Sequence, residues 1–594
     1  MDLFRTIRVP LFERAEEIAR SFSASGRALF YALSALIIGS SIGLLFILNG
    51  ALQTDVPSYG GSYTEGVIGS PRFINPVLAL SDADHDMTAL VYSGLLKASP
   101  DGTFIPDLAE DYAISPDGKT YTVHIRDTAR FQDGVPVTAD DVVFTVGRAL
   151  DPAIKSPTLA NWTGISVRAD DPHTVVFTLA QPYAPFIENL TMGILPKHLW
   201  QNVSADEFPF SELNTKPVGS GPYEVANVSR TSSGIPSSYD LTAFDGYALG
   251  KPYLSRFTMR FYQSEDALVA ALRSGEIEAA SGVSPASLSD LKGFTVSAVP
   301  LSRVFGVFFN QNQNEVLRNA AVRKALSDAI DRKVLVSNVL GSYGVPLTGP
   351  IPPSISHAGE VATTNTEGTG DAAAPQPPAS DEQAAYSLAA KNELLAAGWK
   401  PGPNGVLQLA TGKGKTAKTL TLAFALSTSN VPELRAVAAY VESAWEAMGA
   451  QVSVQVYDQG DLSENVIRPR KYDALLFGEV VGRGLDLFAF WDSKERSDPG
   501  LNIALYANAA VDAALEELRQ ATSDSDRQTL YKKIEAQIES DAPAVFLYSP
   551  DFVYVVPKDV RGMSLGAIGN PSNRFDTVYE WYRETDHVWS IFAR

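Results

Sequence analysis

The stretch KTYTVHIRDTARFQDGVPVTADDVVFTV, residues 119–146, predicts a strand, a turn and a helix in immediate succession. Tyr121, Val123 and Ile125 alternate with polar residues, which is the period of a half-buried strand. An Asp-Gly pair at 133–134 and Pro136 then favour a tight turn before the helix. This order is typical of a chain that packs helices against a sheet.

The helix of this stretch has its own start signal. Thr138 and Asp141 stand three residues apart, which is the spacing of a capping box, and acidic residues favour the first turn of a helix. Phe131 lies in the loop between strand and helix. An aromatic side chain in such a packing unit is more often core than ligand contact, so we expect Phe131 to be buried.

The same mixture of elements continues after residue 62. Strand-like runs include 174–180, 303–310 and 472–480, and helical spacing is clear in 319–340, 381–399, 430–450 and 508–521. The sequence shows no internal repeat. A chain of 594 residues is too long for one core, so the pattern predicts several α/β lobes rather than a sandwich or a barrel.

The composition argues against several classes of function. A formal charge of −20 disfavours nucleic acid as a partner, because its phosphates would be repelled. The absence of cysteine removes disulfides and thiol chemistry. The six histidines are scattered without a close pair, so we expect no metal site and no cofactor. No motif indicates catalysis, and we expect the protein not to be an enzyme.

An uncharged segment near the N-terminus predicts a membrane helix. Residues 28–52 are long enough to cross a hydrocarbon core, which needs about 20 residues. Five arginines precede this segment and no Lys or Arg follows it before Arg72, which places the tail 1–27 in the cytoplasm. A cleaved signal peptide is the alternative, but LNGALQT (48–54) is a poor cleavage site. We predict a single-pass anchor in the cell membrane, with everything after it, beginning with a polar spacer (53–62), on the extracytoplasmic side, periplasmic or cell-surface.

Residues 354–385 differ in composition from the rest of the chain. They contain no Leu, Met or aromatic residue and are rich in Ala, Thr, Gly, Pro and Glu. Such a segment cannot bury enough apolar surface to offset the loss of chain entropy on folding. We therefore predict a disordered insertion inside a lobe.

The opening stretch resembles a signature region of the bacterial extracellular solute-binding protein family 5, the peptide-binding components of ABC importers. That family shows GKxYTFxLRxxVKFHDGxPxTAxDVxFS where this chain has GKTYTVHIRDTARFQDGVPVTADDVVFT (118–145). Similar segments follow in the family's order: KPVGSGPYEV (216–225), EDALVAALRSGEIEAA (265–280), RNAAVRKALSDAIDRKVLV (318–336) and LDLFAFWDSK (485–494). The resemblance extends from Tyr59 to about Gly562.

The resemblance implies the architecture. We expect an α/β, two-lobed clamp of the periplasmic-binding-protein type (class II) with an extra domain, preceded by one N-terminal transmembrane helix. The expected segments are 1–27 for the cytoplasmic tail, 28–52 for the anchor, 59–97, 215–300 and 541–594 for lobe I, 98–214 for the extra domain, and 301–540 for lobe II with its insertion at 354–385.

The resemblance also implies a peptide buried between the lobes, with an aspartate at its terminal amine. Asp486 stands at the matching position, where a carboxylate would give a charge-assisted bond to an ammonium; its alternative role is that of a loop or capping aspartate. Arg483 could meet a ligand carboxylate or be solvated. The remaining candidate contacts are the aromatic residues Phe488 and Trp491, the strand residues Phe309 and Asn310, and Tyr92.

These inferences together predict a monomeric binding protein that captures peptides and delivers them to an ABC permease and, through it, to ATPase subunits. Three alternatives stay open at this point. The same fold could carry a metal chelate, haem, an oligosaccharide or an opine. The chain could also be a surface-anchored hydrolase, or a receptor that signals through its N-terminal segment without transport.

Overall fold

The computed structural model describes residues 21–288, 291, 293–353, 364–367, 380–412, 418–482, 485–521, 523–566, 568–589 and 591. The chain forms two units. The smaller unit combines Met1–Tyr59 with Tyr582–Arg594, and the larger one is Gly60–Trp581.

The smaller unit contains the apolar helix that the sequence predicts. Helix α2 (Ala24–Leu52) starts after Ser23, whose hydroxyl accepts a hydrogen bond from the Gly26 N–H at 3.3 Å. By length and composition α2 is able to cross a membrane. Strand β1 (Gln53–Ser58) follows and pairs antiparallel with β24 (Glu584–Trp589). The expected polar spacer (53–62) is therefore in strands except at Tyr59, because β2 (Gly60–Ile68) begins directly after it.

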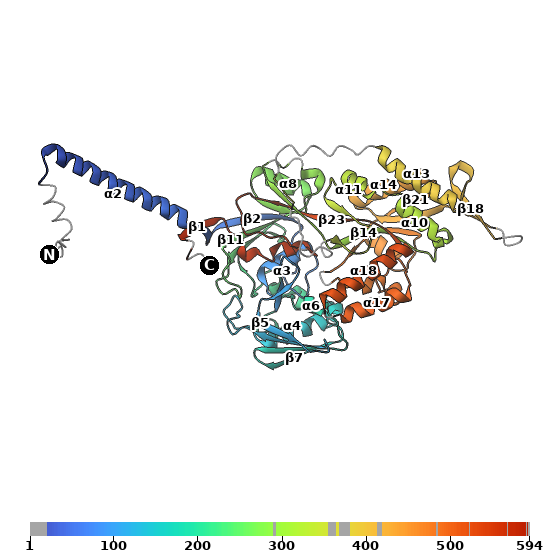
Figure 1. Ribbon diagram of the computed structural model, residues 1–594. Helices are drawn as coiled ribbons and strands as arrows, with labels where there is room; N and C mark the ends of the chain where they lie inside the picture. Colours follow the sequence, from blue (N-terminus) through green and yellow to red (C-terminus); the bar gives the residue numbers. More distant parts are fainter. Residues whose placement is uncertain are drawn as a thin grey trace. The chain divides into compact units, whose positions relative to one another are not determined.

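In the larger unit, one long mixed sheet runs through both lobes (Figure 1). Its strands, in spatial order, are β21 (Gln451–Tyr457), β20 (Ala423–Ser429), β22 (Ala474–Val480), β14 (Arg303–Phe309), β23 (Ala544–Val556), β12 (Ala279–Ser281), β2 (Gly60–Ile68), β11 (Leu254–Tyr262), β10 (Pro236–Ala243) and β9 (Tyr223–Arg230). Strands β13 (Thr295–Pro300) and β15 (Gly344–Pro346) also pair with β23.

Strand β23 connects the two lobes. Its first part pairs with β14, up to Tyr548, and its second part pairs with β13, from Asp551 onward. The apolar residues of the first part lie in the cores of lobe II, whereas Phe552 and Tyr554 lie in the main core of lobe I. The two parts of β23 thus pack in different cores. A second connection runs from β13 to β14.

Helices cover both faces of the lobe II part of the sheet. Side chains of β14 alternate between two cores, with Val307 and Phe309 on one face and Val304 and Phe308 on the other. The first core is closed by α10 (Ala320–Asp328), α11 (Arg332–Val339), α13 (Ser380–Ala396) and α14 (Pro432–Met448), the second by α17 (Ala509–Gln520) and α18 (Asp524–Asp541). A central strand that is buried on both faces explains the continuous apolar run at 304–309.

The predicted insertion is described only in part. Residues 354–363 and 368–379 lie outside the described residues. Between them, β16 (Thr364–Glu367) pairs antiparallel with β13. Helix α13 begins at Ser380, so residues 380–385 of the predicted insertion are helical.

The extra domain contains the stretch 119–146. A sheet of β5 (Ala109–Ile114), β6 (Thr120–Ile125), β8 (Thr174–Leu179) and β7 (Ile165–Asp171) packs with α4 (Ala139–Leu150), and Figure 1 shows these elements at one end of the larger unit. The predicted strand and helix are confirmed, and Phe131 is fully buried. At the helix start, the Thr138 N–H and hydroxyl both donate to Asp141 Oδ2 at 2.8 Å.

The loop between β6 and α4 also joins the extra domain to lobe I. The side chain of Gln132, next to Phe131, donates to the carbonyls of Val91 at 3.1 Å and Tyr223 at 2.8 Å. Its side-chain oxygen accepts from the Gly219 N–H at 2.9 Å. One side chain therefore ties the extra domain to the end of a lobe I helix and to the glycine-rich segment 216–225.

Candidate functional site

A cavity of about 740 Å³ lies between the lobes and the extra domain. Lobe I contributes residues of α3 (Asp82–Val91), β3 (Leu96–Ala98) and segment 569–576, the extra domain contributes residues between 158 and 193, and lobe II contributes Arg303 and residues of 480–486. This volume is within the usual range of ligand pockets, about 300–1,000 Å³.

Two lobe I residues that line this cavity carry buried hydroxyl groups without a partner among the described residues. Tyr92, directly after α3, is only 4% exposed, and its hydroxyl has no hydrogen-bond partner among the described residues. The hydroxyl of Thr88, one turn earlier, lacks a partner in the same part of the chain. A buried hydroxyl without a partner costs free energy, and a ligand that supplies the partner recovers it.

A cation and a buried carboxylate also line the cavity. Lys97 Nζ donates to the Tyr247 hydroxyl at 3.2 Å and lies over the rings of Tyr247 and Tyr579. The Tyr247 hydroxyl donates to Asp107 Oδ2 at 3.4 Å. Burial raises the pKa of Asp107, while the positive charge of Lys97 opposes that rise. Both Lys97 and Asp107 line the cavity.

The lobe II wall carries two charged residues. Arg303 begins β14 and lines the cavity, and its buried Nε has no partner among the described residues. Asp486 lines the cavity too, with 19% of its side chain exposed. Arg519, at the end of α17, pairs with Asp486 at 2.5 Å, and the Tyr183 hydroxyl from the extra domain donates to Asp486 Oδ2 at 3.0 Å.

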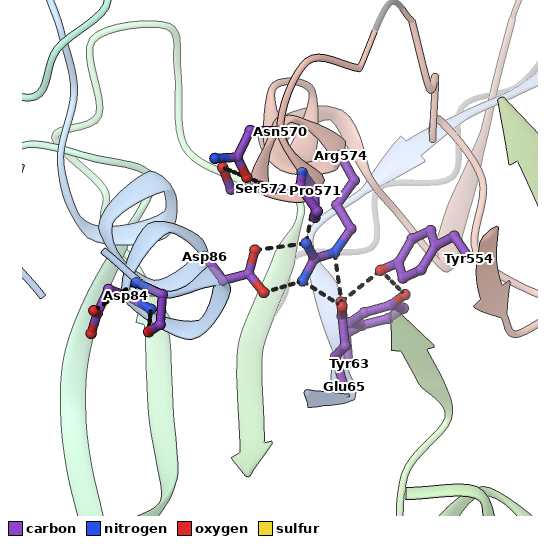
Figure 2. Close-up of polar contacts among 10 residues, drawn as sticks. Tyr63, Glu65, Asp84, Asp86, Tyr554, Asn570, Pro571, Ser572 and Arg574 are labelled. Carbon is purple, nitrogen blue, oxygen red and sulfur yellow. Dashed lines mark hydrogen bonds and ion pairs between the residues drawn. The ribbon is translucent and has the colours of Figure 1, made fainter. Parts of the chain in front are cut away.

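A fully buried ion cluster supports segment 569–576. Arg574 donates to both carboxylate oxygens of Asp86 at 2.7 and 2.6 Å and to Glu65 Oε1 at 2.8 Å. The Tyr554 hydroxyl donates to Glu65 Oε2 at 2.6 Å and lies 2.7 Å from the Tyr63 hydroxyl. Figure 2 shows the guanidinium of Arg574 between the two carboxylates.

The electrostatics of this cluster follow from its composition. One guanidinium faces two carboxylates in a fully buried site, so burial outweighs the attraction to Arg574 and raises the pKa of Glu65 to about 7. Burial raises the pKa of Asp86 as well. The cluster joins β2, α3 and β23 to the segment that supplies Asn570, Ser572, Asn573, Phe575 and Asp576 to the cavity.

The structure brings two of the sequence-predicted residues, Tyr92 and Asp486, to the cavity. Phe488 is half-buried, and the guanidinium of Arg519 lies 3.8 Å from the centre of the Phe488 ring. Phe488 does not line the cavity. Trp491 is completely buried in a lobe II core instead of forming a cavity wall. Arg483 lies outside the described residues.

Phe309 and Asn310, expected to offer main-chain groups to a ligand, have other partners. Both are fully buried. The N–H of Phe309 donates to the Pro543 carbonyl at 3.1 Å, and that of Asn310 donates to the Asp473 carbonyl at 2.8 Å. Strand β14 pairs with β22 on one edge and β23 on the other, so neither edge is available for an added strand.

The sequence reasoning missed most residues of the site, among them Lys97, Tyr183, Arg303 and Arg519. Arg519 lies at the end of a strongly helical pattern, where a basic residue has an ordinary role at the helix terminus. Tyr183 is an aromatic residue in a loop of the extra domain. No spacing in the sequence connects these residues to Asp486.

The described part of the chain contains no group of three or more His, Asp or Glu side chains that could hold a metal ion. His85 lines the cavity as a single histidine among carboxylates and hydroxyls. Apolar side chains such as Leu96, Trp162 and Met192 share the wall with polar and charged groups, a mixture that suits an organic ligand with several donors and acceptors.

Comparison with known proteins gives consistent matches. A family model described as bacterial extracellular solute-binding proteins, family 5 (middle), matches residues 103–494. Protein XP55 of Streptomyces lividans is 30% identical over 512 residues, which cover 84% of this chain and 85% of that protein. The oligopeptide-binding protein AppA of Bacillus subtilis is 27% identical over 540 residues, 89% of this chain and 92% of its own.

Solved structures show the same fold. The structure of Bacillus subtilis AppA in complex with a nonapeptide has a TM-score of 0.65 and 26% identity, and the match covers 89% of this chain and 100% of that one. The crystal structure of NikZ from Campylobacter jejuni in complex with Ni(L-His) also has a TM-score of 0.65, with 25% identity over 88% of this chain and 99% of that one.

Proposed function

The chain belongs to the bacterial extracellular solute-binding proteins of family 5, and on that premise we propose that it captures peptides in the cavity between its lobes and delivers them to the permease of an ABC importer. The permease passes the peptide across the membrane with its ATPase subunits. The protein itself acts as a monomer and performs no bond chemistry.

The observation that carries this proposal is the cavity wall. Tyr92 and Thr88 present buried hydroxyls without partners, and Arg303 presents a guanidinium whose buried Nε has none among the described residues. A peptide has a donor and an acceptor in each residue and satisfies such groups without regard to its side chains. The similarity to AppA with its bound nonapeptide agrees with this cargo.

Closure of the lobes would enclose the ligand. The lobes are joined by β23 and by the connection from β13 to β14, and a few residues in such connections absorb the rotation of a hinge. A peptide that contacts both walls stabilises the closed form by its differential affinity for it. The permease then distinguishes the loaded protein from the empty one by the relative position of the lobes.

Replacing Tyr92 by phenylalanine tests the site. The variant removes a buried hydroxyl without a protein partner, so we expect an unchanged or slightly higher free energy of unfolding. Peptide affinity should fall by about 3- to 10-fold, which corresponds to one hydrogen bond of about 0.5–1.5 kcal/mol. Urea unfolding measures the first quantity, and calorimetry with a pool of short peptides measures the second.

Tyr223→Phe is the matched control. The Tyr223 hydroxyl is buried outside the cavity and donates to the Leu254 carbonyl at 3.2 Å. Its loss should lower the free energy of unfolding by about 1 kcal/mol and leave peptide affinity unchanged. If Tyr92→Phe binds peptides with the affinity of the wild type, the Tyr92 hydroxyl does not contact the ligand.

The identity of the cargo has its own test. If the wild type binds no peptide and yields a metal chelate by mass spectrometry, the cargo resembles that of NikZ instead.

We propose further that α2 is an uncleaved anchor. Its 29 residues span about 44 Å as a helix, more than the hydrocarbon core of about 30 Å. The arginines before it and the absence of Lys and Arg up to Arg72 orient the N-terminus to the cytoplasm. We expect membrane fractions to contain the protein with its N-terminus intact. N-terminal sequencing that finds a mature chain starting between Ala51 and Tyr59 would show a cleaved signal peptide.

A further inference from the structure

The carboxylate of Asp486 lies on the cavity wall, yet its hydrogen-bonding capacity is already used. Oδ1 accepts from the Phe488 N–H at 3.1 Å and from Arg519 Nε at 3.1 Å. Oδ2 accepts from the Tyr183 hydroxyl at 3.0 Å and from Arg519 Nη2 at 2.5 Å. A carboxylate has about four acceptor positions, so these donors fill it.

Arg519 is held firmly in this arrangement. Its guanidinium lies 3.8 Å from the ring centre of Phe488 and 5.2 Å from that of Tyr183. Its carbonyl accepts a hydrogen bond from the Ala184 N–H at 3.0 Å. Only 24% of its side chain is exposed. Contacts from lobe II and from the extra domain therefore fix the same residue, and Arg519 does not itself line the cavity.

This geometry decides what Asp486 can offer a ligand. A carboxylate on a cavity wall ordinarily attracts a cationic group of the ligand. Here the charge is compensated by Arg519, and a ligand ammonium would either add a second cation beside one carboxylate or displace Arg519 from its partner. Both changes cost free energy at a partly buried site.

We propose that Arg519 is a specificity-determining residue, which takes the place of a ligand ammonium at Asp486 and lets the cavity accept peptides whether or not their amino terminus is free. This inference rests on the proposed function and replaces the expectation that Asp486 itself holds the terminal amine. Tyr183 and Phe488 are positioning residues, because their rings pack against the guanidinium that donates to Asp486.

The test compares a pool of short peptides with the same pool after N-terminal acetylation. Calorimetry on the wild type should give affinities that agree within about threefold for the two forms of each peptide. Arg519→Met leaves Asp486 without its cation, so free peptides should then bind at least about 10-fold more tightly than acetylated ones. The double variant Arg519→Met/Asp486→Asn should again bind free and acetylated peptides with similar affinity. This result would show that the preference comes from the charge of Asp486 and not from a change in the fold.

Three results would overturn the inference about Arg519. A wild type that binds acetylated peptides 10-fold or more weakly overturns the inference, even if Arg519→Met does not fold, and leaves the proposed function intact. Equal binding of both pools by Arg519→Met also overturns it. A wild type that binds neither pool overturns the proposed function, and this inference with it.

Discussion

Replacing Arg574 by methionine should lower the free energy of unfolding by about 3–5 kcal/mol or more. The guanidinium of Arg574 has no exposed surface, and neither Glu65 nor Asp86 has more than 1% of its side chain exposed. Among the described residues, Arg574 is the ion-pair partner of both carboxylates, and its replacement leaves them without one. A buried charge without a partner costs several kcal/mol, and here two such groups face each other.

The effect should extend to ligand binding. The short helix that carries Arg574 (Pro571–Phe575) also places Ser572, Asn573 and Phe575 in the cavity wall. If the helix is no longer held against α3 and β2, this part of the wall loses its position. We therefore expect weaker peptide binding by Arg574→Met even at low temperature, where the variant is still folded.

Urea unfolding at pH 7.5 measures the loss, with Arg435→Met as the control. Arg435 is exposed on α14, so its replacement should change the free energy of unfolding by less than about 0.5 kcal/mol. The triple variant Arg574→Met/Glu65→Gln/Asp86→Asn should be more stable than Arg574→Met alone, because no charge remains in the cluster. If the single and the triple variant lose the same free energy of unfolding, the effect comes from packing around the arginine and not from charge.

The ion cluster shows what could not be predicted from the sequence. Glu65 and Arg574 are 509 positions apart, and each is an ordinary charged residue in its local pattern. The same holds for Tyr183 and Asp486, which are 303 positions apart. Local signals, in contrast, predicted β6 and α4 correctly, because alternation and helix capping depend on neighbouring residues only.

The resemblance of motifs predicted the two-lobed fold, but it predicted the residues of the site less reliably. It placed Asp486 and Tyr92 at the cavity, because their segments have counterparts of matching order. It did not reveal that Arg519 pairs with Asp486, since the motif 485–494 does not include α17. Phe309 lies in a strand with both edges paired, which is a property of the sheet and is not visible in the strand's own sequence.

Replacing Gly219 by alanine should be the most damaging single-methyl change near the cavity. A Cβ at this position would lie 2.1 Å from the Val91 carbonyl oxygen and 3.0 Å from the ring of Tyr92. The first contact is with main chain at the end of α3, so no side-chain rotation relieves it. The same carbonyl accepts hydrogen bonds from the Gly221 N–H at 2.8 Å and from Gln132 at 3.1 Å.

Two costs therefore combine in Gly219→Ala. Overpacking of a buried site costs about 1–3 kcal/mol, and the hydrogen bonds to the Val91 carbonyl contribute about 1 kcal/mol each if the carbonyl moves away. We expect a loss of about 3 kcal/mol in the free energy of unfolding. Tyr92 follows Val91 directly, so the displacement should also weaken peptide binding by about 10-fold or more, since small shifts of contact groups are costly.

Gly147→Ala is the matched control for this prediction. Gly147 is exposed in the middle of α4, and a Cβ there would meet nothing within 4 Å. Alanine is a better helix former than glycine by about 0.8–1.0 kcal/mol, so this variant should be as stable as the wild type or more so, with unchanged peptide affinity. If Gly219→Ala retained both the stability and the affinity of the wild type, the close packing of segment 216–225 against α3 would not be what positions Tyr92.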